Sequence, residues 1–290
     1  MQESRLRLIL NNVFLLPPES AYCRKILVVI LISFKKNIHM KTPSILIIAL
    51  CLSFLSLMGC KEDKTEPLPT DSGNSTLSMK FQHTVNGSPL IKNSASFYTN
   101  SAGDEFSVST LQYYISNIEL TRSDNSKVKF GVYKLVDGFE VKNQLIGLTN
   151  VPNGDYKAIS FFIGIDSARN HSGSQDGDLS PAKGMLWTWA SGYLFLKLEG
   201  FYKKGGSQES YRYHIGTDKF LNKLTYPISF SMDKTNKEAT FECDLAEFFK
   251  NPNTFSIQAD DDIQSFPSEE IEAGKLAENM KDMIKIIKIQ

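Results

Sequence analysis

Short runs in which apolar and polar residues alternate recur along the chain from residue 77 onward. The first, Leu77–Val85, ends at the turn dipeptide Asn86-Gly87. Further runs are expected to form strands: Glu105–Thr110, Leu111–Leu120, Phe130–Val136, Tyr156–Ile165, Tyr193–Leu198 and Tyr211–Ile215, followed by Pro227–Met232 and Ala239–Cys243 as a further pair. Two-residue periodicity of this kind is typical of half-buried strands.

Helical periodicity is confined to two stretches near the end of the chain. They are Leu245–Lys250 and Ser268–Met283, and a strand-like run, Ile284–Ile287, follows the second. Many short strands with few helices favour two packed sheets. The pattern therefore predicts an all-β fold, with a single β-sandwich domain over residues 77–290 and one short C-terminal helix.

The residues before this domain read as a targeting segment. A basic start at Met40 and an apolar run, Ser44–Leu57, lead to Leu57-Met58-Gly59-Cys60. A small residue before a Cys at the end of such a run resembles a bacterial lipoprotein signal, which predicts lipidation at Cys60. The apolar run is too short to span a bilayer comfortably. We expect residues 1–59 to be an upstream segment and signal peptide, with the true start at Met40, and the product to be an outer membrane lipoprotein, periplasmic or surface-exposed.

Residues 60–76 are polar and are expected to form a flexible tether. Lys61-Glu62-Asp63 resembles the acidic signals that carry some lipoproteins to the outer face of the outer membrane, although a solvated linker explains it equally well.

Charge and cysteine content narrow the classes of function. The chain has 32 basic and 32 acidic residues, and removal of residues 1–59 leaves 25 and 30, a net charge of −5. No basic patch stands out, so no nucleic acid partner is expected. Cys243 is then the one thiol besides Cys60, which excludes an internal disulfide and favours a buried core thiol.

Three histidines remain after residue 60, and two lie on predicted strands. His83 and His214 are flanked by alternating apolar or aromatic residues, and two such imidazoles facing each other would form half of a copper or zinc site. His171 lies in a loop of small residues and is expected to be solvent-exposed.

Both tryptophans of the chain, Trp187 and Trp189, lie between Pro181 and Gly200. Two indoles two residues apart share one face of an extended chain. Burial in the core, an aromatic platform with Tyr193 for a protein or glycan, and a place beside a metal or redox centre all remain open.

Several motifs, taken in order, resemble the MbnP-like copper-binding family. They are Phe81-Gln82-His83 with Asn86-Gly87, Gly164-Ile165-Asp166, Asp178-Leu179-Ser180-Pro181, Gly184-Met185-Leu186-Trp187-Thr188-Trp189, Gly192-Tyr193, Leu198-Glu199-Gly200 and Tyr213-His214-Ile215-Gly216. The resemblance spans about residues 77–216. It departs from the family at Lys183, where many relatives have His.

This resemblance implies a role and a set of site residues. Members are periplasmic or surface β proteins, often paired with a dihaem cytochrome c peroxidase-like protein, and a tryptophan can be oxidised to kynurenine beside copper. Carried over, the resemblance makes His83 and His214 the metal ligands, Trp187 or Trp189 the modified residue, and Asp166, Met185 and Tyr193 supporting residues. The sequence thus indicates a lipid-anchored copper-binding protein for copper handling or uptake, not an enzyme. The alternative is a metal-free surface binding module that uses the aromatic platform.

Overall fold

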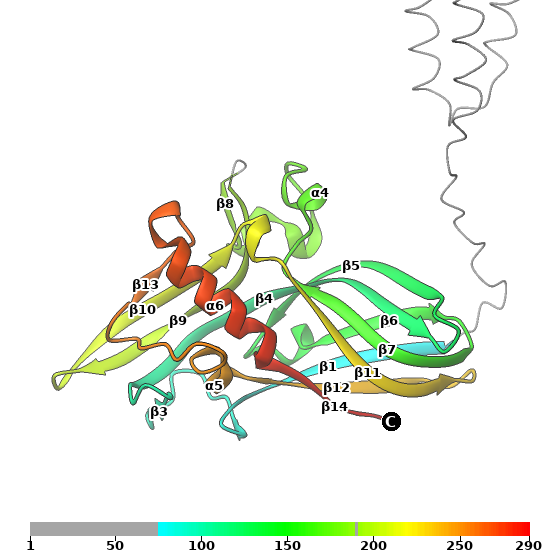
Figure 1. Cartoon of the computed structure of the whole chain (residues 1–290), viewed down its shortest axis with the longest axis horizontal. Coiled ribbons are helices and arrows are strands. Elements are labelled where there is room, and N and C mark those ends of the chain that lie inside the picture. The colour runs from blue at the N-terminus through cyan, green and yellow to red at the C-terminus, as the bar shows by residue number, and fades with distance from the viewer. Residues whose placement is uncertain (1–74, 189–190) are drawn as a thin grey trace, which may run out of the picture. The chain divides into compact units, whose positions relative to one another are not determined.

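The computed structural model describes residues 75–188 and 191–290, which form two mixed β-sheets packed against each other (Figure 1). Cys60, the signal segment and nearly all of the tether lie outside these residues, as does Trp189. The first strand begins at Ser75, close to the predicted start of the domain. The expected all-β sandwich with a C-terminal helix is confirmed.

The smaller sheet is built around β1 (Ser75–Val85), which pairs in parallel with β12 (Lys237–Asp244). The sheet is completed by β14 (Ile284–Ile289) beside β12, and by β2 (Ser88–Pro89) and β6 (Leu145–Val151) beside β1. A parallel pair needs a long crossover, so residues about 160 positions apart lie side by side.

The larger sheet has nine strands. They are β3 (Tyr98–Thr99), β4 (Glu105–Arg122), β5 (Lys127–Asp137), β7 (Gly154–Ile163), β8 (Leu186–Thr188), β9 (Gly192–Lys204), β10 (Ser207–Gly216), β11 (Asn222–Met232) and β13 (Asp262–Ile263). Strand β4 is one continuous strand where two runs were expected. Strands β11 and β12, expected as a pair, lie in different sheets, since β11 pairs with β7.

Strand β4 changes partner halfway along one edge. Tyr113 pairs with β5 and β9, whereas Ile115 pairs with β5 and β7. Because β5 pairs with β4 on the other edge from Gln112 to Thr121, β7 and β9 share an edge of β4 and separate near Tyr114.

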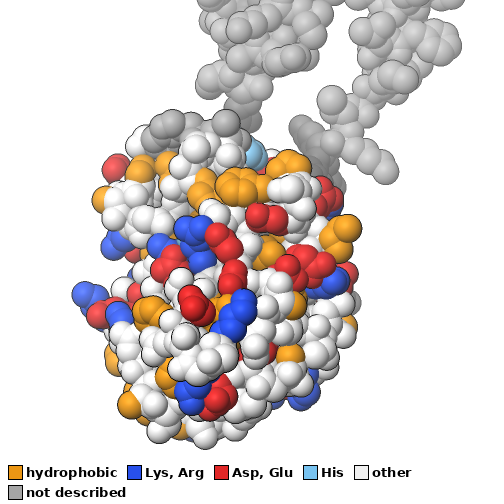
Figure 2. Space-filling model, turned by 90° about the vertical axis from the view of Figure 1, so that its left-hand side faces the viewer, with side chains coloured by type: hydrophobic (Ala, Val, Ile, Leu, Met, Phe, Trp, Pro, Cys, Tyr) orange, Lys and Arg blue, Asp and Glu red, His pale blue; other side chains and the backbone are white. Residues whose placement is uncertain are grey.

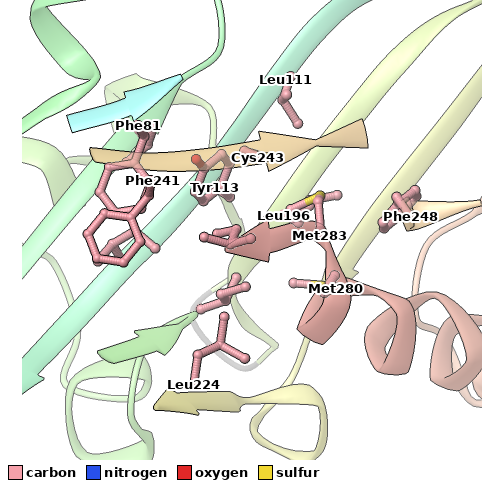
Figure 3. Close-up of a cluster of buried hydrophobic side chains, with 14 of the residues drawn as sticks. Phe81, Leu111, Tyr113, Leu196, Leu224, Phe241, Cys243, Phe248, Met280 and Met283 are labelled. Carbon is pink, nitrogen blue, oxygen red and sulfur yellow. The ribbon is translucent and has the colours of Figure 1, made fainter. Parts of the chain in front are cut away.

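The main core fills the space between the two sheets. Phe81 stacks on Phe241 with ring centroids 5.1 Å apart, and Tyr113 lies near them beside Cys243 (Figure 3). Helix α6 (Glu270–Met283), preceded by a 3₁₀ turn, adds Met280 and Met283 to this core. Short helix α5 (Leu245–Phe248) packs against α6. No helix among residues 75–188 and 191–290 is long and apolar enough to cross a membrane.

A second core lies on the other face of the nine-stranded sheet, which we call the outer face. Tyr114 sits between two inward residues of β4 and therefore points outward. Its cluster consists of Tyr114, Leu135, Ile165, Leu179, Met185, Tyr193, Leu194 and Phe195. Residues 164–188 cover it, and the hydroxyls of Tyr114 and Tyr193 donate to the carbonyls of Asp178 and Leu179, at 2.8 and 2.6 Å. This second core fixes the segment that carries Trp187.

Candidate functional site

His83 points from β1 into the space between the sheets. It occupies the same strand phase as Phe81 and Val85, and its Nε2 lies 3.0 Å from the Tyr113 hydroxyl. Its Nδ1 is buried without a hydrogen-bond partner among the described residues. Burial lowers the pKa of His83 to about 4, and the charge of Asp137 offsets this only in part. His83 is therefore a neutral imidazole inside the main core.

His214 lies on the outer face of the nine-stranded sheet. Tyr213 and Ile215 point into the main core, so strand alternation turns His214 the other way. Its Nε2 is 2.8 Å from Oε1 of Glu199, and its side chain is 11 % exposed. Burial lowers the pKa of His214, and the opposing effect of Glu199 does not restore it.

The contact with Glu199 sets the tautomer of His214. Burial raises the pKa of the Glu199 carboxyl, but the hydrogen bond from His214 and the charge of Lys197 outweigh burial and hold it below its usual value. An ionised carboxylate only accepts, so Nε2 of His214 must donate. In the neutral ring the lone pair is then on Nδ1, which no described residue engages by a hydrogen bond. A carboxylate that orients an imidazole in this way is typical of metal-ligating histidines.

The structure does not bring His83 and His214 together. Both are flanked by alternating apolar residues, but His83 shares the phase of those residues and His214 takes the opposite phase. The expectation that both point into one space therefore fails, because the nine-stranded sheet lies between them. Their individual roles as ligands stay predictions.

Trp187 packs at the end of β10, the strand that carries His214. Its ring stacks on Phe266, with centroids 5.7 Å apart and planes 20° from parallel. It also packs against Gly216, two residues beyond His214: a Cβ built there would lie 3.2 Å from Trp187 Cζ3 and 2.7 Å from the Tyr193 carbonyl oxygen. The Tyr193 carbonyl therefore requires glycine at this position, and the indole packs closely over it.

Ser265 ties Phe266 to the same strand. Its hydroxyl donates to the carbonyl of His214 at 3.1 Å and accepts from the backbone N–H of Gly216 at 3.3 Å. The aromatic partner of Trp187 is therefore held by the backbone on both sides of residue 215.

The three predicted supporting residues act through the covering segment. Met185 and Tyr193 are buried in the second core, so Tyr193 is not part of an exposed platform. The Asp166 carboxylate caps helix α4 (Ser167–Asn170) and accepts hydrogen bonds from Asn117 and Tyr133. These residues position the segment around Trp187, and within residues 75–188 and 191–290 none of them forms a hydrogen bond with His214.

Helix α4 ends in a polar cluster that the sequence did not reveal. Asn170 accepts from the backbone N–H of Tyr193 at 2.8 Å and donates to Asp218 at 2.7 Å. His171 is exposed, as expected, and its Nε2 lies 3.2 Å from both carboxylate oxygens of Asp218. The sequence did not identify Glu199, Asp218 or Phe266 as site residues. Of the three, Glu199 alone lies in a motif of the family resemblance, Leu198-Glu199-Gly200.

Within the part of the chain that the structure describes, no three His, Cys, Asp or Glu side chains group as a ready-made metal site. His214 with Glu199, beside Trp187, is the place where a predicted ligand and a predicted modified residue lie on one strand face.

Comparison with known proteins identifies the family of the chain. The MbnP family profile matches residues 74–266. No curated protein matches the chain. The solved structure of MbnP from Methylosinus trichosporium is similar, at 13 % identity and a TM-score of 0.48, over 73 % of this chain and 97 % of that one. The profile match covers about two thirds of the sequence, and the chain belongs to the MbnP family, which implies a role in copper handling.

Proposed function

We propose that this protein binds copper for handling or uptake and catalyses no reaction, with His214 as a ligand on the outer face beside Trp187. The observation that carries the proposal is the 2.8 Å contact between Nε2 of His214 and Oε1 of Glu199. His214 lies two residues before Gly216, on which Trp187 packs. Imidazole nitrogen suits copper, and the carboxylate fixes the ring so that Nδ1 faces away from Glu199.

Trp187 extends the proposal to oxidation by a partner. Its indole is partly exposed at the edge strand β8, where another protein can reach it. Conversion to kynurenine replaces an indole, which offers only a donor, by an aromatic amine and a carbonyl that can bind a metal. We infer that a dihaem cytochrome c peroxidase-like protein supplies the oxidant.

A lipid anchor at Cys60 completes the proposal and places the protein at the outer membrane, in the periplasm or on the surface. Its support is Leu57-Met58-Gly59-Cys60 after the apolar run. A Cys60→Ser variant should lose acyl labelling and membrane association. Acylated protein in that variant would rule out the anchor at this residue.

A second candidate function is a metal-free binding module for a protein or glycan. The observation that favours it is the stacking of Trp187 on Phe266, because Phe266 is 45 % exposed to solvent. Figure 2 shows hydrophobic side chains gathered across the upper part of one side of the molecule. Stacked aromatic rings can hold apolar ligand faces.

Metal analysis of protein purified from its native envelope separates these functions. The copper proposal predicts bound copper in the native wild type and much less in a native His214→Ala variant. Copper-free wild-type protein that retains a partner or glycan through Phe266 would favour the binding module.

A further inference from the structure

We propose that His171 is an exposed entry ligand for copper, which binds the ion through Nδ1 while Asp218 holds Nε2. The inference rests on the proposed function and adds a residue and a step to it: an ion from solvent meets His171 before it reaches His214.

The His171–Asp218 pair repeats the arrangement at His214. Nε2 of His171 lies 3.2 Å from both carboxylate oxygens of Asp218, as Nε2 of His214 lies 2.8 Å from a carboxylate oxygen of Glu199. The ionised carboxylate accepts, so Nε2 of His171 donates and the neutral ring carries its lone pair on Nδ1. No described residue forms a hydrogen bond to that Nδ1. Both outer histidines are thus oriented by carboxylates.

A hydrogen bond from Asn170 and the backbone conformation of Thr217 both fix the position of Asp218. Asn170 donates to its Oδ1 at 2.7 Å, and Asn170 is itself fixed by the backbone of Tyr193. The preceding residue, Thr217, has a φ of 75°, a left-handed value that is strained for a β-branched side chain. Strain of this kind persists where the surroundings require a particular geometry, and it clusters at functional sites.

The same contacts place His171 at the hairpin of Trp187. The hairpin returns through Gly192, where any Cβ would overlap the Asn170 side chain. Asp218 follows two residues after Gly216, on which Trp187 packs. Asn170, the residue before His171, therefore links the hairpin that carries the indole to Asp218, just beyond the strand that carries His214.

The difference in exposure determines which of the two imidazoles an incoming ion meets first. The side chain of His171 is 44 % exposed, against 11 % for His214. An ion from solvent therefore reaches the more exposed imidazole of His171 sooner than the largely buried imidazole of His214. The alternative role for His171, a solvated ion pair with Asp218, predicts no response to metal.

The test uses the purified protein and aqueous Ag⁺, a diamagnetic ion with the soft-ligand preference of Cu⁺. We expect the free protein to show the Nε2–H tautomer of His171 by ¹⁵N NMR, and the Nδ1 resonance to shift at the first additions of Ag⁺. Shifts at His214 with none at His171 would overturn the inference and leave the proposed function intact. Shifts at neither residue would overturn both.

Loading kinetics provide the second readout. A His171→Gln variant should take Cu⁺ from a chromophoric chelator about tenfold more slowly, with an unchanged final stoichiometry. Asp218→Asn should slow loading less, because it keeps the imidazole but loses the charge that orients it. Ser174→Ala, an exposed and uncharged change on the same covering segment, is the matched control and should load at the wild-type rate. Equal rates for His171→Gln and the control would contradict the entry role.

Discussion

Nε2 of His214 donates to Oε1 of Glu199 at 2.8 Å, on the face of the nine-stranded sheet that points away from the main core. This contact leaves Nδ1 as the atom that can bind a metal. It also makes the orientation of the ring depend on a charge from the neighbouring strand, since Glu199 lies on β9, opposite Arg212 and diagonal to His214 on β10.

The first prediction concerns Glu199. A Glu199→Gln variant should weaken copper binding about 10–100-fold, because an amide no longer fixes the proton on Nε2 of His214. Competition titration against a copper chelator measures the change. Glu209→Gln, an exposed substitution on β10 itself, is the control and should leave the affinity unchanged. Equal affinities in both variants would remove Glu199 from the site.

The second prediction concerns the pH dependence of stability through His83. Burial lowers the pKa of His83 from 6.5 to about 4, so below pH 6.5 the unfolded chain binds a proton that the folded protein refuses. The free energy of unfolding should therefore fall as pH drops from about 6.5 to 4, by up to about 3 kcal/mol from this residue.

Urea unfolding over this pH range measures the effect. A His83→Gln variant should lose stability less steeply than wild type as the pH falls. Identical slopes for wild type and His83→Gln would show that His83 is not buried in its neutral form.

The third prediction concerns Gly216. A methyl group at this position would lie 2.7 Å from the Tyr193 carbonyl oxygen and 3.2 Å from the Trp187 ring. Gly216→Ala should destabilise the protein by about 1–3 kcal/mol and shift tryptophan emission to the red as the indole is displaced. Gly274→Ala is the control: its nearest neighbour is 3.8 Å away, and alanine should stabilise helix α6 by up to ~1 kcal/mol. An unshifted emission spectrum in Gly216→Ala would contradict the packing of Trp187.

The fourth prediction concerns oxidation of the tryptophans. Recombinant protein made without the dihaem partner should keep both indoles, and native protein should carry kynurenine at Trp187 or Trp189. Peptide mapping by mass spectrometry distinguishes the two positions. Intact indoles in native protein from cells that express the partner would remove the oxidative step and leave copper binding to His214 alone.

The sequence predicted most strands because two-residue alternation follows directly from burial of one sheet face. The same rule indicates the orientation of His214: Tyr211, Tyr213 and Ile215 form the apolar phase, so residue 214 must face away. The expectation that His83 and His214 face each other was wrong because apolar neighbours alone do not show which face of the sheet a histidine occupies.

Other features depend on contacts that local pattern does not encode. The parallel pairing of β1 with β12 joins residues far apart in the chain, and the second core is covered by a segment of short 3₁₀ turns with little periodicity. Phe266 is placed near Trp187 by Ser265, which bonds to the β10 backbone at His214 and Gly216. Such long-range pairings are specified by packing of the whole domain.

Copper titration of single-histidine variants tests the central claim most directly. The account predicts that His214→Ala weakens copper affinity at least about 100-fold, whereas folded His83→Gln binds copper as tightly as wild type, because that imidazole faces the main core on the other side of the sheet. Unchanged affinity in His214→Ala, with loss of binding in His83→Gln, would contradict the account and place the copper site between the two sheets.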